Sequence, residues 1–248
     1  MTTVPAPRFS LVVPAYNEER WLPLLLDSVE AARFACSLGD GAVEVIVADN
    51  ASTDRTAEVA SARGCRVVRI EKRCIAAARN GGAAVARGDV LLFVDADARI
   101  HPRTFEAVDE ALATGRVVGG ATGVSLDRWS AGIALTWAVM VPMVWVTGMD
   151  TGVVFCRRAD FEAVSGYDER RRFAEDVIFL LALRRLGRGR GRRLVRLRRV
   201  KAVASTRKFD EHGDWHYLTT ILGLPLATLV RPRAAERLVD RYWYRPER

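Results

Sequence analysis

The sequence predicts an α/β fold with an open, mostly parallel sheet and helices on both of its faces. Two observations support this prediction. From Phe9 to Gly115, short apolar runs alternate with segments of helical spacing, which is the strand–helix order of parallel sheets. The chain also has 248 residues, of which 50% are hydrophobic, so it can bury the core that such a sheet needs.

The first half contains four strand–helix pairs. Glu18 and Glu19 favour the N-terminus of the first helix, because acidic side chains complement the helix dipole there. Ser52 or Thr53 can cap the second helix, and Pro102 suits the first turn of the fourth. The expected strands cover 9–15, 43–50, 65–70 and 90–97, and the expected helices cover 18–34, 52–64, 75–89 and 102–115.

The second half is less regular. We expect strands over 117–126, 151–158 and 192–203, a short helix over 159–169 and a longer helix over 174–188. No repeat or low-complexity linker divides the chain. We therefore expect one domain over 1–248, with a first half over about 9–125, a second half over about 126–210 and a helical, basic C-terminal extension over about 211–248.

The most apolar stretch, Ile133 to Trp145, is about a third shorter than the roughly 20 residues of a membrane-spanning helix. Pro142 also interrupts it, so we interpret it as buried or interfacial. The aromatic and methionine side chains in and near it belong to a core or, alternatively, to an acceptor groove: Trp137, Met140, Met143, Trp145 and Met149. Asp150 is a candidate acceptor contact.

Cysteine usage and the N-terminus favour a cytoplasmic protein. The four cysteines form no C-x-x-C pair, which is typical of a reducing compartment rather than of a disulfide framework or zinc site. The opening residues MTTVPAPRF lack the apolar core of a signal peptide.

The formal charge of +8 and the pI of about 9.8 favour anionic partners. Ten basic residues and no acidic one lie between Arg184 and Lys201. Such a run is usually a solvated face; the alternative is attraction to anionic lipid at the inner face of a membrane, or to an acidic acceptor. Nucleic acid is a poor fit, because the run lacks interleaved aromatic residues that would stack on bases.

Polar residues follow three of the expected strands, namely Pro14-Ala15-Tyr16-Asn17-Glu18, Asp49-Asn50 and Asp95-Ala96-Asp97. Ligands of open parallel sheets bind beyond the carboxyl ends of the strands, so these residues should meet in one crevice. If strand geometry persists, Asp95 and Asp97 point to one spot and can hold a cation; the alternative is an ordinary turn. Neither a dinucleotide-binding nor a P-loop motif is present.

Four motifs resemble those of the family 2 inverting glycosyltransferases, which have the GT-A fold. The chain carries VVPAYNEE, VADNASTDRT, AARNGGAAVARGDVLLFVDADARI and GYDERRRFAEDVIFLLALRRLG in the order of that family. They run from about residue 9 to 187. The resemblance implies a Rossmann-like sheet whose first half, to about residue 125, binds a nucleotide sugar, and whose second half holds the acceptor and catalytic residues.

The resemblance also implies roles for individual residues. Asp176 would be the general base of a hexosyltransferase-type reaction, and Asp97 would bind a divalent metal, Mg²⁺ or Mn²⁺, with Asp95 on the metal or ribose. Three residues of a late loop would complete the site, with His212 as a further metal ligand and Arg207 and Lys208 over the diphosphate. The remaining donor contacts, to a UDP-sugar by preference, would be Pro14, Ala15, Tyr16, Glu18, Asp49, Asn50, Arg79 and Ala96.

The chemistry of sugar transfer fits these residue types independently. A hard cation held by carboxylates neutralises the leaving diphosphate, and a further carboxylate accepts the proton of the acceptor hydroxyl. The acceptor stays open among lipid-linked molecules, small molecules and peptides. The Q-x-x-R-W motif of processive synthases is absent from the sequence. The alternative function is a non-catalytic protein that binds a nucleotide sugar, or binds nucleic acid with its basic face.

Overall fold

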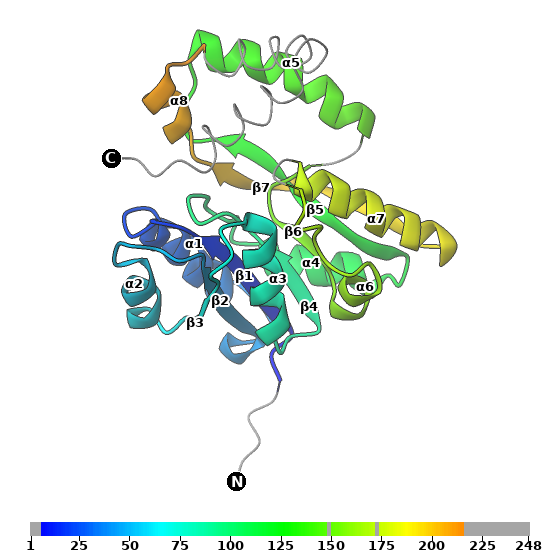
Figure 1. Ribbon diagram of the computed structural model, residues 1–248. Coiled ribbons are helices and arrows are strands. Elements are labelled where there is room, and N and C mark those ends of the chain that lie inside the picture. Colours follow the sequence, from blue (N-terminus) through cyan, green and yellow to red (C-terminus); the bar gives the residue numbers. More distant parts are fainter. Residues whose placement is uncertain (1–5, 148–149, 172–173, 216–248) are drawn as a thin grey trace. The chain divides into compact units, whose positions relative to one another are not determined.

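The structure is a computed structural model that describes residues 6–147, 150–171 and 174–215 (Figure 1). The strands within these ranges are β1 (Phe9–Ala15), β2 (Val43–Asp49), β3 (Arg66–Arg69), β4 (Val90–Phe93), β5 (Val117–Leu126), β6 (Val154–Arg157) and β7 (Arg193–Ala204). The helices are α1 (Leu22–Phe34), α2 (Thr56–Ala62), α3 (Ile75–Val85), α4 (Thr104–Ala113), α5 (Ala131–Thr147), α6 (Arg158–Ala163), α7 (Glu175–Gly189) and α8 (Arg207–His212). A short 3-10 helix, Asp40–Ala42, precedes β2.

The strands form one sheet in the order β3-β2-β1-β4-β6-β5-β7. The neighbours β3, β2, β1 and β4 are parallel, whereas β6 is antiparallel to both β4 and β5. The expected open and mostly parallel sheet is therefore confirmed, with β6 as an antiparallel strand inside it.

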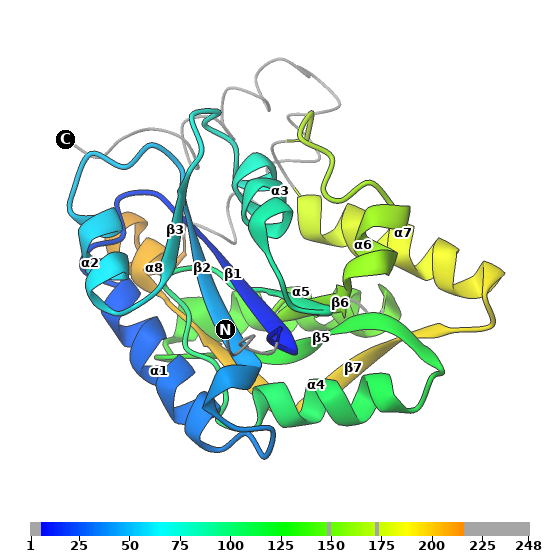
Figure 2. The same ribbon diagram turned by 90° about the horizontal axis from the view of Figure 1, so that it is seen from below.

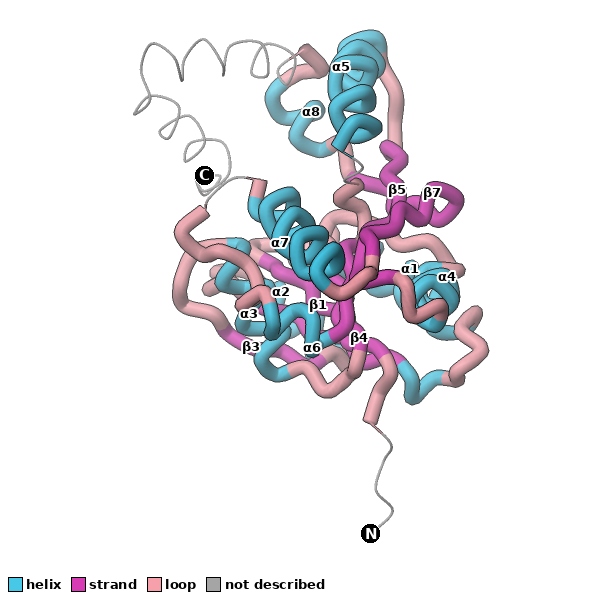
Figure 3. The backbone as a smooth tube through the Cα atoms, turned by 90° about the vertical axis from the view of Figure 1, so that its right-hand side faces the viewer, coloured by secondary structure: helices cyan, strands magenta, loops and turns pink. Residues whose placement is uncertain are grey.

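Helices cover both faces of the sheet (Figures 2 and 3). Phe9, Leu11 and Val13 of β1 belong to the apolar cluster that includes α1 and α4, whereas Val12 belongs to the cluster that includes α3, α6 and α7. Successive residues of a strand point to opposite faces, so all seven residues of β1 are buried. This explains why the strand reads as a continuous apolar run.

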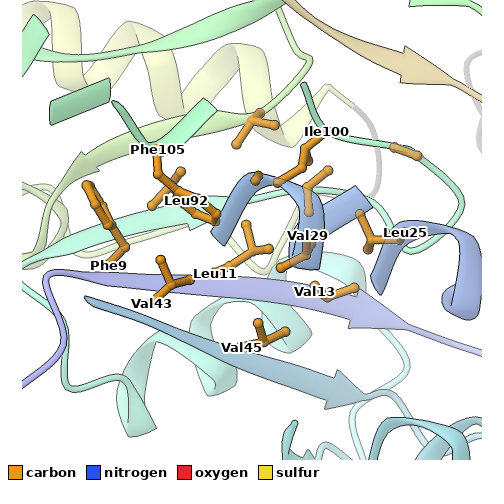
Figure 4. Packing of buried hydrophobic residues seen from close by; sticks show 14 of the residues in the cluster. Phe9, Leu11, Val13, Leu25, Val29, Val43, Val45, Leu92, Ile100 and Phe105 are labelled. Atoms are coloured by element: carbon orange, nitrogen blue, oxygen red, sulfur yellow. The ribbon is translucent and has the colours of Figure 1, made fainter. Parts of the chain in front are cut away.

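The larger cluster packs α1 and α4 onto β1, β2 and β4 (Figure 4). Leu25 and Val29 of α1 and Phe105 of α4 have at most 1% of their surface exposed. Burying such a side chain contributes about 1.5–3 kcal/mol each. The cluster fixes the first four strands and thereby the position of the loops at their carboxyl ends.

Two helices begin later than the sequence predicts. Helix α1 begins at Leu22 rather than Glu18, and α2 begins at Thr56 rather than near Ser52. The residues before each helix are bonded to the other loop instead, as described below. Asn17 also has a positive φ of 54°, which interrupts helical geometry.

The chain forms two compact units. Unit 1 comprises Met1–Ser125 and Met149–Ala204, and unit 2 comprises Leu126–Gly148 and Ser205–Arg248. This division differs from the predicted halves, and the predicted domain boundaries stay a prediction. Most of the predicted extension, 216–248, lies outside the described residues. Among the described helices, none is long and apolar enough to cross a membrane.

Candidate active site

The carboxyl ends of β1, β2 and β4 lie side by side in unit 1. Ala15, the last residue of β1, is paired with Asp49, the last residue of β2. Val12 of β1 is paired with Phe93, the last residue of β4. The loops that begin at Tyr16, Asn50 and Val94 therefore start from the same end of the sheet, where open α/β sheets bind their ligands.

Backbone-to-side-chain hydrogen bonds join the loops after β1 and β2. The backbone N–H of Asn17 donates to Ser52 Oγ at 3.1 Å, and that of Glu18 donates to Thr56 Oγ1 at 2.7 Å. In return, the N–H of Thr53 donates to Asn17 Oδ1 at 2.8 Å. Because these hydrogen bonds join residues about 35 positions apart in the sequence, they hold the two loops together in one rim around the strand ends.

Asp49 and Asn50 have different local roles. Asp49 is 2% exposed, accepts a hydrogen bond from the Ser52 N–H at 3.0 Å and lies 3.6 Å from the Arg69 guanidinium. Asn50 fixes the loop that leads into α3: its amide donates to the carbonyls of Ile70 and Lys72, at 3.0 and 2.7 Å, and its Oδ1 accepts the Cys74 N–H at 3.0 Å. The predicted donor contact of each stays a prediction.

Tyr16 carries an arginine on its ring. The guanidinium carbon of Arg73 lies 3.6 Å from the ring centroid, a cation–π stack. Pro14 and Ala15 are buried, and Glu18 is 8% exposed. A planar base beside Tyr16 would therefore meet the Arg73 side chain, a residue that no sequence motif had indicated.

Arg79 occupies the centre of the acidic cluster. Its side chain leaves α3 and is 4% exposed. Its Nη2 donates to Asp95 Oδ1 at 2.9 Å, and its Nη1 donates to Glu175 Oε1 at 2.9 Å. The same Nη1 lies 2.9 Å from Asp176 Oδ1. The D-x-D turn and the predicted base at the start of α7 are therefore held by one buried cation.

The predicted general base has an unusual environment. Burial raises the pKa of the Asp176 carboxyl to about 6, against the attraction of Arg79, and the neighbouring carboxylates Asp95 and Glu175 raise it as well. Its side chain keeps 18% of its surface exposed. A carboxyl group whose pKa is raised toward neutrality, on a side chain that keeps part of its surface exposed, suits general acid–base chemistry.

Buried polar atoms without hydrogen-bond partners gather at the same place. Within the described ranges these atoms are Arg79 Nε, Tyr167 Oη and Asp176 Oδ1, although Asp176 Oδ1 keeps its ion pair with Arg79 Nη1 at 2.9 Å. The Tyr167 ring centroid lies 5.1 Å from the Arg79 guanidinium carbon. Native proteins leave few such atoms unpaired, and those that remain commonly mark functional sites.

Strand β4 ends at Phe93, so Asp95-Ala96-Asp97 forms a turn rather than a continued strand. The Ala98 N–H donates to the Asp95 carbonyl at 3.1 Å. The strand expected over 90–97 is therefore shorter than predicted, and of the two alternatives for Asp95 and Asp97 the structure has the turn. Asp95 nevertheless keeps 56% of its side-chain surface exposed, Asp97 is half-buried, and Ala96 is 3% exposed.

The carboxylates of Asp95 and Asp97 are chemically suited to Mg²⁺ or Mn²⁺, which prefer oxygen ligands. In the described ranges, no group of three or more His, Cys, Asp or Glu side chains is placed to hold a metal by itself. The residues therefore fit a site in which the protein supplies two carboxylates and a diphosphate supplies further oxygens.

Arg207, Lys208 and His212 lie on α8 in unit 2. His212 Nδ1 lies 3.2 Å from the Lys208 carbonyl and 3.9 Å from Glu211. The roles of these three residues in the donor site stay predictions.

The other candidate acceptor residues are partly described. Asp150 is 8% exposed and accepts a 2.7 Å hydrogen bond from Arg196 Nε. Trp137 is half-buried and packs edge-on against Trp129. The side chains of Met140, Met143, Trp145 and Met149 lie outside the described residues.

The basic run is partly structural. Arg190 and Arg192 both donate to Asp160, which is 1% exposed. Arg198 and Arg199 instead line a hollow of about 560 Å³ beside α4, and Figure 2 shows α4 next to β7. That hollow contains none of the predicted donor-site residues. Part of the charge that the sequence presents as a binding face therefore neutralises a buried carboxylate.

Fold and site together define an α/β protein with a carboxylate-rich site at the carboxyl end of its parallel strands. The family model described as "Glycosyl transferase family 2" matches residues 10–174, well over half of the chain. The chain belongs to glycosyl transferase family 2.

Curated relatives match just under half of the chain. The undecaprenyl-phosphate 4-deoxy-4-formamido-L-arabinose transferase of Pseudomonas paraeruginosa is 35% identical over 127 residues, covering 48% of this chain and 37% of that protein. The dolichyl-phosphate beta-glucosyltransferase of Drosophila melanogaster is 37% identical over 118 residues, covering 44% and 36%. The chain thus spans less than two fifths of the length of these two relatives.

Solved structures share the fold. TarS 1-349 of S. aureus in complex with UDP-GlcNAc has a TM-score of 0.62 and 20% identity, covering 81% of this chain and 59% of that one. The mannosyltransferase PcManGT of Pyrobaculum calidifontis, in complex with GDP-Man and Mn2+, has a TM-score of 0.61 and 20% identity, covering 80% and 57%. The predicted GT-A fold is confirmed.

Sequence reasoning missed several residues of the cluster. Glu175 received no role in the sequence analysis, yet it shares Arg79 with Asp176. Tyr167 lies within the GYDE motif but received no role. The available signal was the pair of adjacent carboxylates, Glu175 and Asp176, at the start of a predicted helix, together with Tyr167 in the motif that precedes them.

Proposed function

We propose that this chain is an inverting glycosyltransferase that moves a sugar from a nucleotide-diphosphate sugar, UDP-sugars being favoured, to an acceptor oxygen. The observation that carries the proposal is the placement of Asp176. Its carboxyl group titrates near pH 6 and shares the buried Arg79 with Asp95 of the D-x-D turn. A base and a metal-binding turn held by one residue suit a reaction between an activated donor and an acceptor.

The donor would lie at the ends of β1, β2 and β4. Tyr16 and Asp49 would contact the base and Glu18 the ribose, with Pro14, Ala15, Asn50, Arg79 and Ala96 lining the site. Asp95 and Asp97 would hold a divalent cation. Once bound, that cation would neutralise the charge that develops on the departing diphosphate. The solved structures of the same fold that contain UDP-GlcNAc, or GDP-Man with Mn2+, support this part.

In the proposed step, the acceptor oxygen attacks the anomeric carbon from the face opposite the diphosphate. The new O–C bond forms as the bond from that carbon to the diphosphate oxygen breaks, and the nucleoside diphosphate leaves with the bonding electron pair. Asp176 accepts the proton of an acceptor hydroxyl. Attack from the opposite face inverts the configuration of the sugar carbon. Arg79 orients the Asp176 carboxylate throughout.

A lipid phosphate is one candidate acceptor, and the names of the undecaprenyl-phosphate and dolichyl-phosphate relatives support it. A phosphate oxygen is already largely ionised at neutral pH, so transfer to it would need the base less than transfer to a hydroxyl. Comparing the two acceptor types with Asp176→Asn would therefore separate them. Hexose as the sugar, a cytoplasmic location and peripheral contact with an anionic membrane complete the proposal.

The experiment is a thermal-shift screen of folded protein against UDP-, GDP-, dTDP- and CDP-sugars, with and without Mg²⁺ or Mn²⁺. A ligand that binds only the native state stabilises it and thereby raises the melting temperature. At a ligand concentration of 100 times the Kd, the added free energy of unfolding is about 2.7 kcal/mol. A shift that needs the metal and one nucleotide supports the proposal.

If no donor shifted the melting temperature, the proposed function would be contradicted, and the alternative of nucleic-acid binding by the basic face would be favoured. Donor binding without sugar transfer to any acceptor tested, lipid phosphates included, would favour a non-catalytic binding protein. Family membership favours the transferase over a nucleic-acid-binding role.

A further inference from the structure

Helix α5 presents an apolar face to the surroundings. Its exposed residues through residue 139 are spaced at i, i+3, i+4, i+7 and i+8, which places them on one side of an α-helix. Leu135 and Val139 are 45% and 42% exposed. The members of this face, here named the α5 apolar face, are Ala131, Ala134, Leu135, Ala138 and Val139.

The opposite side of α5 is the side that packs within unit 2. Ile133 is 0% exposed and Thr136 is 6% exposed, with the Thr136 hydroxyl donating to the Gly132 carbonyl. Gly132 lies against the backbone of Asp214, so close that a Cβ there would be 2.6 Å from the Asp214 carbonyl oxygen. Arg128 pairs with Asp214 at 2.7 Å and secures the same junction. The α5 apolar face is therefore not needed for packing against these residues.

Exposed tryptophans stand beside the start of α5. Trp129 is 56% exposed and packs edge-on against Trp137, at 5.8 Å between ring centroids. Trp215, which is 54% exposed, directly follows the Asp214 that abuts Gly132. Tryptophan is enriched where apolar tails meet lipid headgroups, because its ring is apolar and its N–H is polar. Contiguous exposed apolar surface of this kind marks an interaction site.

The length of α5 and the net charge of the protein favour the surface of an anionic bilayer as the partner of this face. A helix of 17 residues is about 25 Å long, less than the roughly 30 Å hydrocarbon core of a bilayer. It contains no charged residue, so its exposed side can contact lipid without burying a charge. The net charge is +8, and in the described ranges several exposed basic side chains have no ion-pair partner: Arg185, Arg188, Arg193, Arg198, Arg199 and Lys201.

We propose that the α5 apolar face docks on the surface of an anionic phospholipid bilayer. This inference deepens the proposed function and rests on it for its purpose, because it would bring the enzyme to a lipid-linked acceptor. Vesicle binding itself does not require transfer. Burial of the Leu135 and Val139 side chains supplies the apolar attraction, and the net charge of +8 supplies the attraction to anionic lipid.

The test is co-sedimentation of the full chain with vesicles of phosphatidylcholine, with or without phosphatidylglycerol. The variant Leu135→Glu with Val139→Glu places two charges on the α5 apolar face. The matched control is Leu24→Glu, since Leu24 is 44% exposed on α1 of unit 1. Wild type and control should bind the anionic vesicles, with a blue shift of tryptophan fluorescence, and the double variant should lose binding at least tenfold. Circular dichroism and the donor thermal shift should be unchanged in both variants.

Equal vesicle binding by the double variant and wild type would overturn the proposal. A wild-type protein that binds no vesicles would also overturn it. So would a wild-type protein that is dimeric without lipid while the double variant is monomeric, because a second copy of the chain would then be the partner of the α5 apolar face. A wild type that binds vesicles but shows no donor shift would reject the proposed function and leave the docking surface standing.

Discussion

Nη1 of Arg79 lies 2.9 Å from Oδ1 of Asp176, while Nη2 of the same guanidinium lies 2.9 Å from Oδ1 of Asp95. One side chain of α3 thus joins the turn after β4 to the first residues of α7. The three segments are far apart in sequence, and they meet because α3 and α7 cover the same face of the sheet. A change at Arg79 should therefore affect both carboxylates together.

Arg79→Ala should destabilise the protein by about 3 kcal/mol, because it leaves the carboxylates of Glu175 and Asp176 close together without their cation. Denaturant unfolding measures the loss. The matched control is Arg103→Ala, whose side chain is 59% exposed and pairs with Glu110, whose side chain is 63% exposed; such a surface pair contributes about 1 kcal/mol or less. Equal losses in the two variants would show that Arg79 does not hold the cluster.

Asp176 should make stability and activity depend on pH. Its native pKa of about 6 lies above the ordinary 3.8, so the folded state retains its proton over a range in which the unfolded state has lost it. Stability therefore falls as pH rises through this window, and is fully reduced above about pH 6. Asp176→Asn removes the effect. The free energy of unfolding of Asp176→Asn minus that of wild type should therefore be about 2 kcal/mol more positive at about pH 7.5 than at about pH 4.5.

Transfer to a hydroxyl acceptor needs the ionised Asp176 carboxylate, so wild-type activity should fall below about pH 6. Initial rates measured across the pH range locate this fall in activity. If Asp176→Asn kept wild-type rates and lost activity at the same pH, Asp176 would not be the base.

Asp97→Ala should abolish the metal-dependent part of the donor thermal shift, because a hard cation loses one of two carboxylate ligands. The control Asp89→Ala lies just before β4, with a side chain that is 80% exposed and 3.7 Å from Arg8. It should keep the full shift. If Asp97→Ala retained a shift that depends on Mg²⁺ or Mn²⁺, the metal would be held elsewhere.

Gly82→Ala should destabilise the fold although alanine favours helices. A Cβ on Gly82 would overlap the Val12 side chain on β1, because α3 packs closely on the sheet. Overpacking of a core typically costs about 1–3 kcal/mol. Gly189→Ala, in the last turn of α7, meets no atom within 4 Å and should instead be neutral or stabilising by up to about 1 kcal/mol. Melting temperatures of the two variants give the comparison, and a stable Gly82→Ala would mean that α3 can move away from β1.

The strands and their order along the chain were predictable because buried parallel strands read as short apolar runs. Strands β1 and β5 have the predicted bounds, Phe9–Ala15 and Val117–Leu126. The starts of α1 and α2 were not predictable, since they depend on bonds such as that from the Glu18 N–H to Thr56 Oγ1, which join distant loops. Local sequence carries no signal for such long-range pairs.

The site was predictable in its residue types rather than in its contacts. The strand ends predicted Asp95 and Asp97 as carboxylates of one crevice, and the family resemblance implied Asp176 as the general base and Arg79 as a donor contact. The sequence did not indicate that Arg79 is buried between Asp95 and Asp176, nor that the Asn50 amide is engaged by the loop before α3. Such contacts depend on the packing of α3 against its neighbours, which periodicity does not reveal.

Strand β7 is last in the sheet order, and Val203 near its end bridges Arg99. The rim of a sheet exposes backbone groups that can recruit a strand from another molecule, the first step of aggregation. Arg193, Arg198 and Lys201 are exposed along β7, so two copies meeting rim to rim would bring like charges together. Variants that neutralise these residues would lose this repulsion between copies, and they should precipitate more readily at high concentration.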